Sequence, residues 1–298
     1  MTRAIDRRDV LKLGVLVAGS TLGVCPSAMA DGPSCTAIVR RPEVRELNAD
    51  QWDRFANAVK QLPGPVSGRY YDRAVADYHD NTVERRGVPA FLPWLRTSLR
   101  RFEQALNRVD PSVGLPYWDW SKDYQTPGQS PLLSASYFGG TGRPSDGTVI
   151  GGSFAHWKCT LPDAHELRRS GRKVPSMPSP EEIESVLARS DRYDSLRASL
   201  EQHFTSVLKA IGGQAGDLST NYAPNDPLFW VIAGFTDLLW AEWQQRRPAL
   251  SRTYNGQAGG KNVSPNDTLQ PFKVPVSSTL DIRAPGFCYY YSRWSARP

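Results

Sequence analysis

Phe91-Leu92-Pro93-Trp94-Leu95-Arg96 is the stretch that decides the fold of this 298-residue chain. From here onward apolar side chains recur every three or four residues, at Leu95, Leu99, Phe102, Leu106 and Val109. That spacing places them on one face of a helix, because an α-helix turns once in about 3.6 residues. We therefore expect a long helix that begins near Pro93 and buries this face in a protein core.

The same spacing predicts further amphipathic helices before and after this one. Apolar stripes occur over residues 50–62, 70–80 and 194–210, and again from Asp226 through Trp243. At Ser179-Pro180-Glu181-Glu182 a capping serine precedes a proline and two acids, which is typical of a helix start.

Residues 121–177 are instead rich in Gly, Pro and Ser and show no sustained period, which predicts a long irregular excursion. Amphipathic helices with one such excursion favour a helical bundle, whose core is a usual place for a buried metal or ligand site. We expect a mainly α fold with a four-helix bundle core and long irregular loops.

Two further motifs accompany the first stretch: Leu115-Pro116-Tyr117-Trp118-Asp119-Trp120 and Asn225-Asp226-Pro227-Leu228-Phe229-Trp230. Together the three motifs resemble those of bacterial and fungal tyrosinases, and the resemblance covers roughly residues 39–291. It implies the tyrosinase bundle, in which each of two coppers is held by three histidines. Arg40-Arg41 and Tyr289-Tyr290-Tyr291 resemble the Arg and Tyr pair that closes the core of that fold.

No histidine stands at the places that the resemblance assigns to the copper ligands. These places hold Tyr78, Arg86 and Leu95 on the side of one copper, and Phe204, Leu208 and the pair Ile232-Ala233 on the side of the other. Imidazole is the neutral nitrogen donor that binds copper in such sites, whereas Leu, Phe and Ile have no lone pair to offer. We therefore expect no metal and no cofactor here, and no phenol oxidation by the dicopper mechanism.

The composition of this centre leaves two readings open. In one, Leu95, Phe204, Leu208, Ile232 and Ala233 are the apolar walls of a substrate pocket. Its two polar groups are then catalytic, with Tyr78 donating a proton and Arg86 holding a carboxylate or a phenolate. In the other, the space is a filled core and Arg86 points outward, since each buried apolar side chain adds about 1.5 to 3 kcal/mol.

Four histidines and several charged residues remain to be placed. His79 and His203 each lie one residue from a ligand place, which turns a helical side chain by roughly 100 degrees. His156 and His165 fall in the irregular excursion, and a metal held by relocated ligands is a minor reading of these four. We expect Asp119, Asp226, Asp237 and Arg96 to be structural ties, because buried charges are normally paired.

The N-terminus carries a targeting signal. Arg7-Arg8-Asp9-Val10-Leu11-Lys12 is a twin-arginine pattern, and an apolar stretch and the small-residue site Ala28-Met29-Ala30 follow it. The apolar stretch is shorter than the roughly 20 residues of a spanning helix. We expect residues 1–30 to be a signal peptide and residues 31–298 to be a single domain with no further C-terminal domain. The chain should be exported by the twin-arginine route, be periplasmic or extracellular, and keep no stable membrane insertion.

Cleavage would leave three cysteines, Cys35, Cys159 and Cys288. An oxidising compartment permits one disulfide among them, and the sequence does not choose the pair, although Cys35 and Cys288 would join the two ends. The sequence contains no CxxC motif, so a cysteine-based zinc site is not expected.

The charge of the chain gives little support to a nucleic-acid partner. The formal net charge of +6 falls to +4 without residues 1–30, which carry four basic and two acidic side chains. Clusters such as Arg96/Arg100/Arg101 and Arg168/Arg169/Arg172/Lys173 are interrupted by acids, as in a solvated surface.

Two functions fit these observations. The first is an exported, copper-free enzyme that transforms an aromatic or phenol-derived small molecule by acid-base chemistry, as a cyclase or isomerase does, within secondary-metabolite biosynthesis. The alternative is a non-catalytic pseudoenzyme that acts as partner or chaperone of another exported enzyme, through an exposed aromatic rim that includes Trp94 and Trp230.

Overall fold

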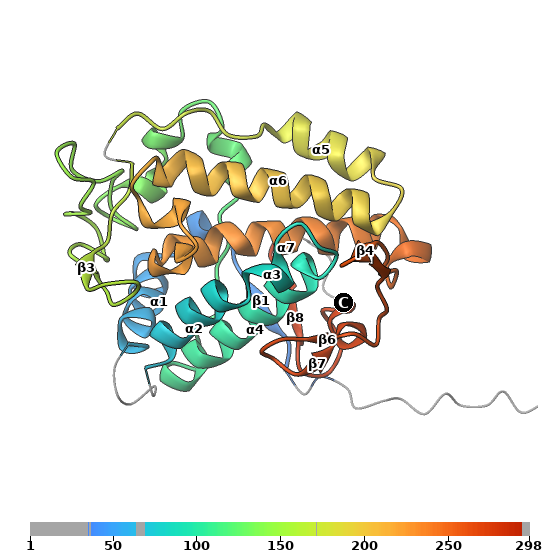
Figure 1. Cartoon of the computed structure of the whole chain (residues 1–298). Coiled ribbons are helices and arrows are strands. Elements are labelled where there is room, and N and C mark those ends of the chain that lie inside the picture. The colour runs from blue at the N-terminus through green and yellow to red at the C-terminus, as the bar shows by residue number, and fades with distance from the viewer. Residues whose placement is uncertain (1–34, 36, 64–68, 171, 294–298) are drawn as a thin grey trace, which may run out of the picture. The chain divides into compact units, whose positions relative to one another are not determined.

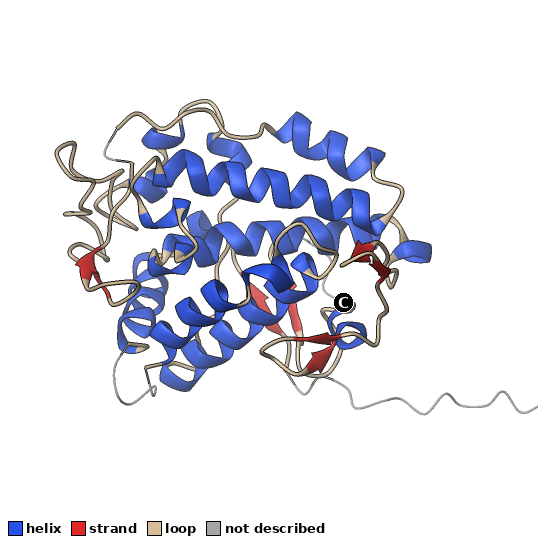
Figure 2. Cartoon of the chain, viewed as in Figure 1, coloured by secondary structure: helices blue, strands red, loops and turns tan. Residues whose placement is uncertain are grey.

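Helices dominate the computed structural model, which describes residues 35, 37–63, 69–170 and 172–293. The expected signal peptide, residues 1–30, lies outside the described residues. The helices are α1 (Ala49–Gln61), α2 (Tyr70–Asp80), α3 (Thr82–Arg85), α4 (Phe91–Val109), α5 (Pro180–Arg189), α6 (Tyr193–Gly212) and α7 (Leu228–Arg246) (Figures 1 and 2). The expected mainly α fold is confirmed, and the helices predicted from apolar spacing lie within a few residues of their expected bounds.

Helix α7 is the centre of the bundle, and residues 228–241 along it are all buried. A helix that is apolar on every side can exist only where other elements surround it. Helices α4 and α6 both pack against α7, and α2 packs against α4 (Figure 1). These four helices form the predicted bundle core, while α1 packs on α4 and α5 packs on α6.

The helix ends follow from local sequence. Ser179 accepts a hydrogen bond from the backbone N–H of Glu182, whose side chain in turn accepts one from the N–H of Ser179. This reciprocal cap satisfies two N–H groups that a helix start leaves without partners. Helix α6 ends at Gly212, where Gly213 adopts a φ of 62°, a conformation that costs glycine little.

Short elements decorate the bundle. The excursion over residues 121–177 contains three 3₁₀ turns, η3 (Trp120–Asp123), η4 (Pro127–Gln129) and η5 (Pro131–Leu133), and one small hairpin of β2 (Lys158–Cys159) and β3 (His165–Glu166). Later in the chain β4 (Gln257–Ala258) pairs with β5 (Lys261–Asn262), and β6 (Thr268–Leu269) pairs with β7 (Val274–Pro275). Two further turns, η6 (Asp217–Ser219) and η7 (Ala223–Asn225), connect α6 to α7.

The two ends of the described chain are tied together. Strand β1 (Val39–Arg41) lies parallel to β8 (Tyr289–Tyr291), and each residue of one strand has a partner in the other. A disulfide joins Cys35 to Cys288 beside this ladder, so the structure selects one of the pairings that the sequence left open. The remaining cysteine of the described residues, Cys159, is buried and free.

Asp237 of α7 holds this closure to the bundle. Its carboxylate accepts hydrogen bonds from Tyr289 at 2.5 Å and Tyr291 at 2.6 Å, and it pairs with Arg96 at 2.6 Å and Arg41 at 3.3 Å. Burial raises the pKa of Asp237, but the two guanidinium groups and the two phenols outweigh burial and lower it. The expected structural role of Arg96 and Asp237, and the expected Arg and Tyr closure, are both confirmed.

Candidate functional site

Six of the residues predicted at the centre lie together in the protein interior. They are Tyr78 on α2, Leu95 on α4, Phe204 and Leu208 on α6, and Ile232 and Ala233 on α7. All six belong to one buried apolar cluster, and the most exposed of them, Leu208, is 5% exposed. The four core helices therefore converge on this point, as the resemblance implies.

Aromatic rings fill the middle of this cluster. The ring of Phe229 lies 4.9 Å from that of Tyr78 and 5.7 Å from that of Phe204, in edge-to-face arrangements. The ring of Phe91 lies 5.7 Å from that of Phe204. Such ring pairs are favourable and leave little space between them, so the geometry matches the filled core better than the open pocket.

The structure does not bring Arg86 into the centre. Helix α3 ends at Arg85, and Arg86 turns to an extended backbone, which directs its exposed side chain to the surface beside Glu201 and Thr205. Its neighbour Arg85 is buried instead, with its guanidinium carbon 3.4 Å above the centre of the Tyr78 ring. The Nε group of Arg85 also donates a hydrogen bond to the carbonyl of Tyr78 at 2.7 Å.

These two arginines are adjacent in the sequence, but one side chain points into the protein and the other points to the surface. Counting along the sequence found the right segment but not the residue, because nothing in the sequence marks where the short helix α3 ends. The signal that could have favoured Arg85 is the presence of two adjacent arginines, of which one had to face inward.

The phenol of Tyr78 has a pKa above its ordinary value. Burial raises this pKa, and the opposing effects of Arg85 and Arg86 are smaller. A catalytic acid or base works best with a pKa near the working pH, and this shift moves the phenol away from neutrality. The hydroxyl of Tyr78 therefore stays protonated in the folded protein.

The side chains at this centre do not fit a pair of copper ions. Six residues supply one phenol oxygen, and the remaining atoms that they present are hydrocarbon. Type-3 copper sites take imidazole nitrogen, and softer or borderline metals likewise prefer nitrogen or sulfur ligands. None of the four histidines of the chain, all among the described residues, is fully buried.

Comparison with known proteins agrees with the bundle and its motifs. Residues 50–246 match the family model described as the common central domain of tyrosinase. The chain belongs to the tyrosinase family. It is 38% identical over 269 residues to a tyrosinase of Streptomyces antibioticus, a match that covers 80% of this chain and 95% of that protein.

Two further proteins are similar to this tyrosinase-family chain. Grixazone synthase of Streptomyces griseus is 33% identical over 258 residues, covering 68% of this chain and 83% of that protein. The solved polyphenol oxidase of Thermothelomyces thermophila superposes with a TM-score of 0.72 at 22% identity, over 87% of this chain and 90% of that one. At this level of identity, the similarity to the polyphenol oxidase shows the fold alone.

The histidines of this tyrosinase-family chain lie around the bundle. His79 stacks on Tyr222 with ring centres 4.2 Å apart, and burial lowers the pKa of His203. His156 is exposed, with its Nδ1 atom 3.2 Å from the carboxylate of Glu166. His79 and His203 are each partly exposed beside a buried neighbour, Tyr78 and Phe204, which agrees with the one-residue rotation predicted for them.

The prediction of an exposed aromatic rim that is available to a partner protein is wrong. Trp94 and Trp230 are each 1% exposed. The hairpin of β6 and β7 covers Trp94, whose indole N–H donates to the carbonyl of Gln270 and whose ring lies 5.2 Å from that of Phe272. Trp230 stacks on Phe102 at 3.8 Å. Segments far along the sequence provide these covers, which is why the motif alone suggested exposure.

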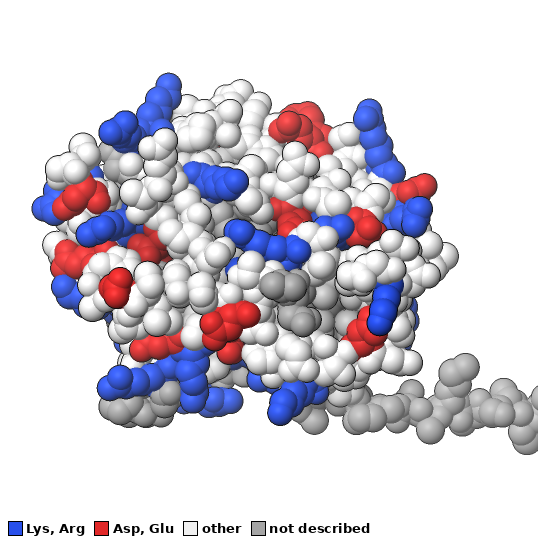
Figure 3. Space-filling model, in the orientation of Figure 1, with Lys and Arg blue, Asp and Glu red and all other residues white. Residues whose placement is uncertain are grey.

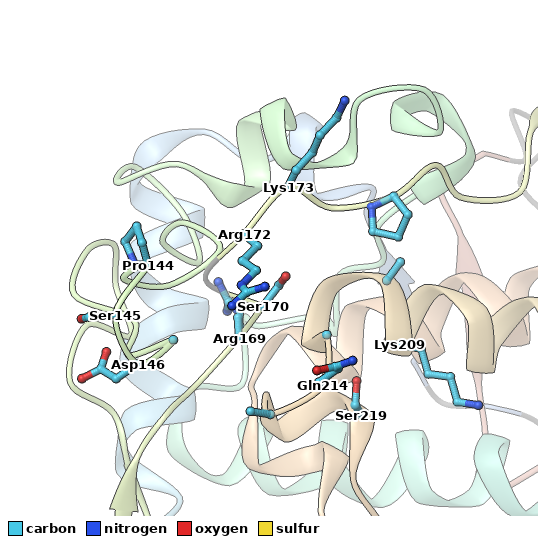
Figure 4. Close-up of a pocket in the computed structure, with 15 residues that line it drawn as sticks. Pro144, Ser145, Asp146, Arg169, Ser170, Arg172, Lys173, Lys209, Gln214 and Ser219 are labelled. Atoms are coloured by element: carbon cyan, nitrogen blue, oxygen red, sulfur yellow. The ribbon is translucent and has the colours of Figure 1, made fainter.

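A hollow of about 770 Å³ lies on the surface between the excursion and the end of α6 (Figure 4). Lys173, Arg172 and Lys209 lie around it, with Ser170, Gln214 and Ser219 among its polar lining. None of the predicted pocket residues lines this hollow. It is a surface feature, separate from the residues at the bundle centre.

The surface of this tyrosinase-family chain mixes charges of both signs. On the face shown in Figure 3, basic and acidic side chains alternate without a continuous basic stripe. Many basic residues are paired, as Arg246 is with Glu184 and Arg197 is with Glu201. Among the described residues, no helix combines the length and the apolar character needed to cross a membrane.

Proposed function

We propose that this chain has lost the copper ligands of the tyrosinase family and does not oxidise phenols. Instead it acts by binding, as the partner of another exported enzyme. The observation that carries the proposal is the packing of the bundle centre, where Phe229 contacts the rings of both Tyr78 and Phe204. Copper chemistry needs several nitrogen donors and open space at this point, whereas these side chains offer one phenol oxygen and closely packed rings.

The same packing weighs against the acid-base enzyme. A substrate at Tyr78 would have to displace buried rings, and each buried aromatic side chain contributes on the order of 3 kcal/mol to stability. The phenol would also have to work with a pKa that burial raises. A small-molecule ligand has more room in the surface hollow near Lys209 than at the centre.

Relatives in secondary metabolism agree with a specialised role. Grixazone synthase carries the name of a product, and this chain shares 33% of its residues over their match. A tyrosinase-like chain within such a pathway would serve beside an active enzyme, and would keep the fold while its centre drifts toward a packed core. Loss of catalytic side chains with retention of their scaffold is what a binding role permits.

Export through the twin-arginine route is part of this proposal. The disulfide between Cys35 and Cys288 supports it, because disulfides persist in oxidising compartments such as the periplasm and the extracellular space. Arg7-Arg8 supplies the sequence signal for that route.

Metal content and oxygen uptake test the first half of the proposal. The full chain is incubated with copper, freed of excess metal, and assayed with a monophenol and a catechol, with a copper-loaded Streptomyces tyrosinase as positive control. We expect no bound copper pair and no oxygen uptake above the protein-free rate. Two coppers per chain together with turnover would overturn the proposal.

Tyr78→Phe separates the two remaining functions. If the chain is a binding partner, this variant keeps both its fold and its complex with an exported phenol oxidase, measured by the mass of the eluted complex. If the chain is an acid-base enzyme, the variant abolishes product formation in the producing cell. Product loss in the variant with unchanged protein abundance would therefore replace the binding role by the catalytic one.

A further inference from the structure

Three metal-ligating side chains meet outside the bundle centre. Cys159 of β2, His165 of β3 and Asp217 of η6 present one sulfur, one ring nitrogen and one carboxylate oxygen within 4.8 Å of one another. The hairpin places Cys159 and His165 directly opposite each other, and η6 brings Asp217 to them from the connection between α6 and α7. Residues far apart in sequence thus converge on one point.

The hydrogen bonds of His165 leave a place for a cation. Its Nδ1 atom lies 2.7 Å from the carbonyl of Asp163, which can only accept a hydrogen bond. Its Nε2 atom lies 2.9 Å from Oδ1 of Asp217, which as a carboxylate also only accepts. A neutral imidazole has one N–H, so one of these contacts needs a second proton or a metal ion.

The arrangement around Nδ1 and Asp217 is that of a supported metal ligand. Metal-binding histidines usually donate their other ring N–H to a carbonyl or carboxylate, which fixes the ring. The carboxylate of Asp217 is held on both oxygens, by the side-chain amide of Asn225 and by the backbone N–H of Arg168, each at 2.9 Å. Both side chains are therefore oriented before any ion arrives.

Cys159 completes the set. Cys159 is 4% exposed, and its thiol donates to the carbonyl of Asn225 at a sulfur-to-oxygen distance of 4.0 Å. Burial raises the pKa of this thiol, and the carboxylates of Asp217 and Asp226 raise it further.

We propose that Cys159, His165 and Asp217 bind one zinc ion. Zinc takes sulfur at about 2.3 Å and nitrogen or oxygen at about 2.0–2.2 Å, so ligand atoms around it lie roughly 3.3–3.8 Å apart. The three ligand atoms here lie within 4.8 Å of one another, about one ångström above that spacing at most. A thiolate, an imidazole and a carboxylate suit zinc, whereas magnesium and calcium prefer oxygen ligands alone.

The site would fasten the irregular excursion to the bundle. Cys159 and His165 belong to the excursion, while Asp217 precedes the turn η7 that leads into α7. Three protein ligands leave a fourth position, and the side chain of His165 is 20% exposed, so a water molecule can reach the ion. The zinc site is separate from the bundle centre and does not depend on the proposed function.

Zinc content of the full chain tests the proposal. The protein is stripped with a chelator, equilibrated with zinc, freed of excess metal, and analysed by elemental mass spectrometry. We expect about one zinc ion per chain, and at least about a tenfold weaker affinity in Cys159→Ser and in His165→Gln. His156→Gln is the matched control, because His156 is an exposed histidine of the same excursion that contacts Glu166 instead. This control should keep the full zinc content.

Two further measurements use the unaltered protein and so do not depend on variants that fold. Cobalt in place of zinc should give the wild-type protein a thiolate-to-cobalt charge-transfer band. Zinc should also slow the alkylation of Cys159 in the native protein. A stripped wild-type chain that takes up no zinc, or equal zinc content in the wild type and in both ligand variants, would overturn the proposal. The His165 and Asp217 contact would then be a plain ion pair.

Discussion

The guanidinium of Arg85 lies over the ring of Tyr78, with its central carbon 3.4 Å from the ring centre. The same arginine donates a hydrogen bond to the backbone carbonyl of Tyr78. One buried cation thus joins α3 to α2 at the edge of the bundle centre. It lies beside the place where the family resemblance implies a copper ligand, and its contacts are those of a structural tie.

Removal of this tie should destabilise the protein. Arg85→Ala is expected to lower the free energy of unfolding by about 2–3 kcal/mol, since a desolvated cation–π contact and a buried hydrogen bond are lost. Arg86→Ala should change it by less than about 0.5 kcal/mol, because that side chain is exposed. Chemical denaturation of the two variants gives the comparison. Equal effects would show that Arg86 shares the buried role.

The packed centre should respond to cavities as a core does. Phe204→Ala is expected to cost about 3–5 kcal/mol and Leu208→Ala about 2–5 kcal/mol, because both leave a void among buried rings. Gln202→Ala, on the exposed face of the same helix, is the control and should be nearly neutral. If Phe204→Ala were neutral in urea denaturation, the centre would be an open pocket and the acid-base enzyme would regain support.

The carboxylate network around Asp237 should make the fold sensitive to acid. Burial raises the pKa values of Asp237 and Glu103, but neighbouring arginines outweigh it and lower both. Arg96 has the larger effect on Asp237, and Arg41 has the larger effect on Glu103. A lowered folded-state pKa gives stability that is present above the unfolded value of about 4 and is lost as pH falls through the folded value. Unfolding free energies measured between pH 6 and pH 2, as an approximate range, should therefore fall steadily below about pH 4.

Asp237→Asn tests the source of that acid sensitivity. The variant should lose about 3–5 kcal/mol at neutral pH, because two buried arginines lose their counter-charge, and its stability should vary less with pH. Asp50→Asn is the control, since its side chain is 74% exposed and its pair with Arg54 is weak. An unchanged acid slope in Asp237→Asn would assign the sensitivity to Glu103 instead.

The disulfide between Cys35 and Cys288 should stabilise the closed chain. Replacing both cysteines by serine is expected to lower the free energy of unfolding by about 2–4 kcal/mol, because the unfolded chain loses a cross-link between distant residues. A reducing agent should lower the melting temperature of the wild type to that of the double variant. It should leave the melting temperature of the double variant unchanged. A further shift of the double variant on reduction would point to another disulfide.

Export by the twin-arginine route can be tested in the producing cell. Replacing Arg7 and Arg8 by lysine should leave the protein in the cytoplasm, because that route reads the arginine pair. Fractionation and blotting show the location, and N-terminal sequencing of the exported form should begin at Asp31. Normal export of the variant that carries both R7K and R8K would exclude this route.

The sequence determined the bundle because apolar periodicity depends only on neighbouring residues. The stripe from Leu95 to Val109 and the cap at Ser179 were predicted where α4 and α5 are found. The same local information identified the aromatic and aliphatic residues of the centre, since the family motifs fix their places along each helix. It did not show whether they enclose a pocket, because that depends on rings such as Phe229 supplied by a different helix.

Only the tertiary structure decided which groups meet across long sequence separations. It selected Cys35 and Cys288 from three cysteines, covered Trp94 with a hairpin from the C-terminal part of the chain, and put Arg85 in the place expected for Arg86. It also brought Asp217 to Cys159 and His165. The absence of a CxxC motif had argued against a zinc site in this chain. Local sequence sets helix and turn, whereas contacts between distant segments depend on how the whole chain packs.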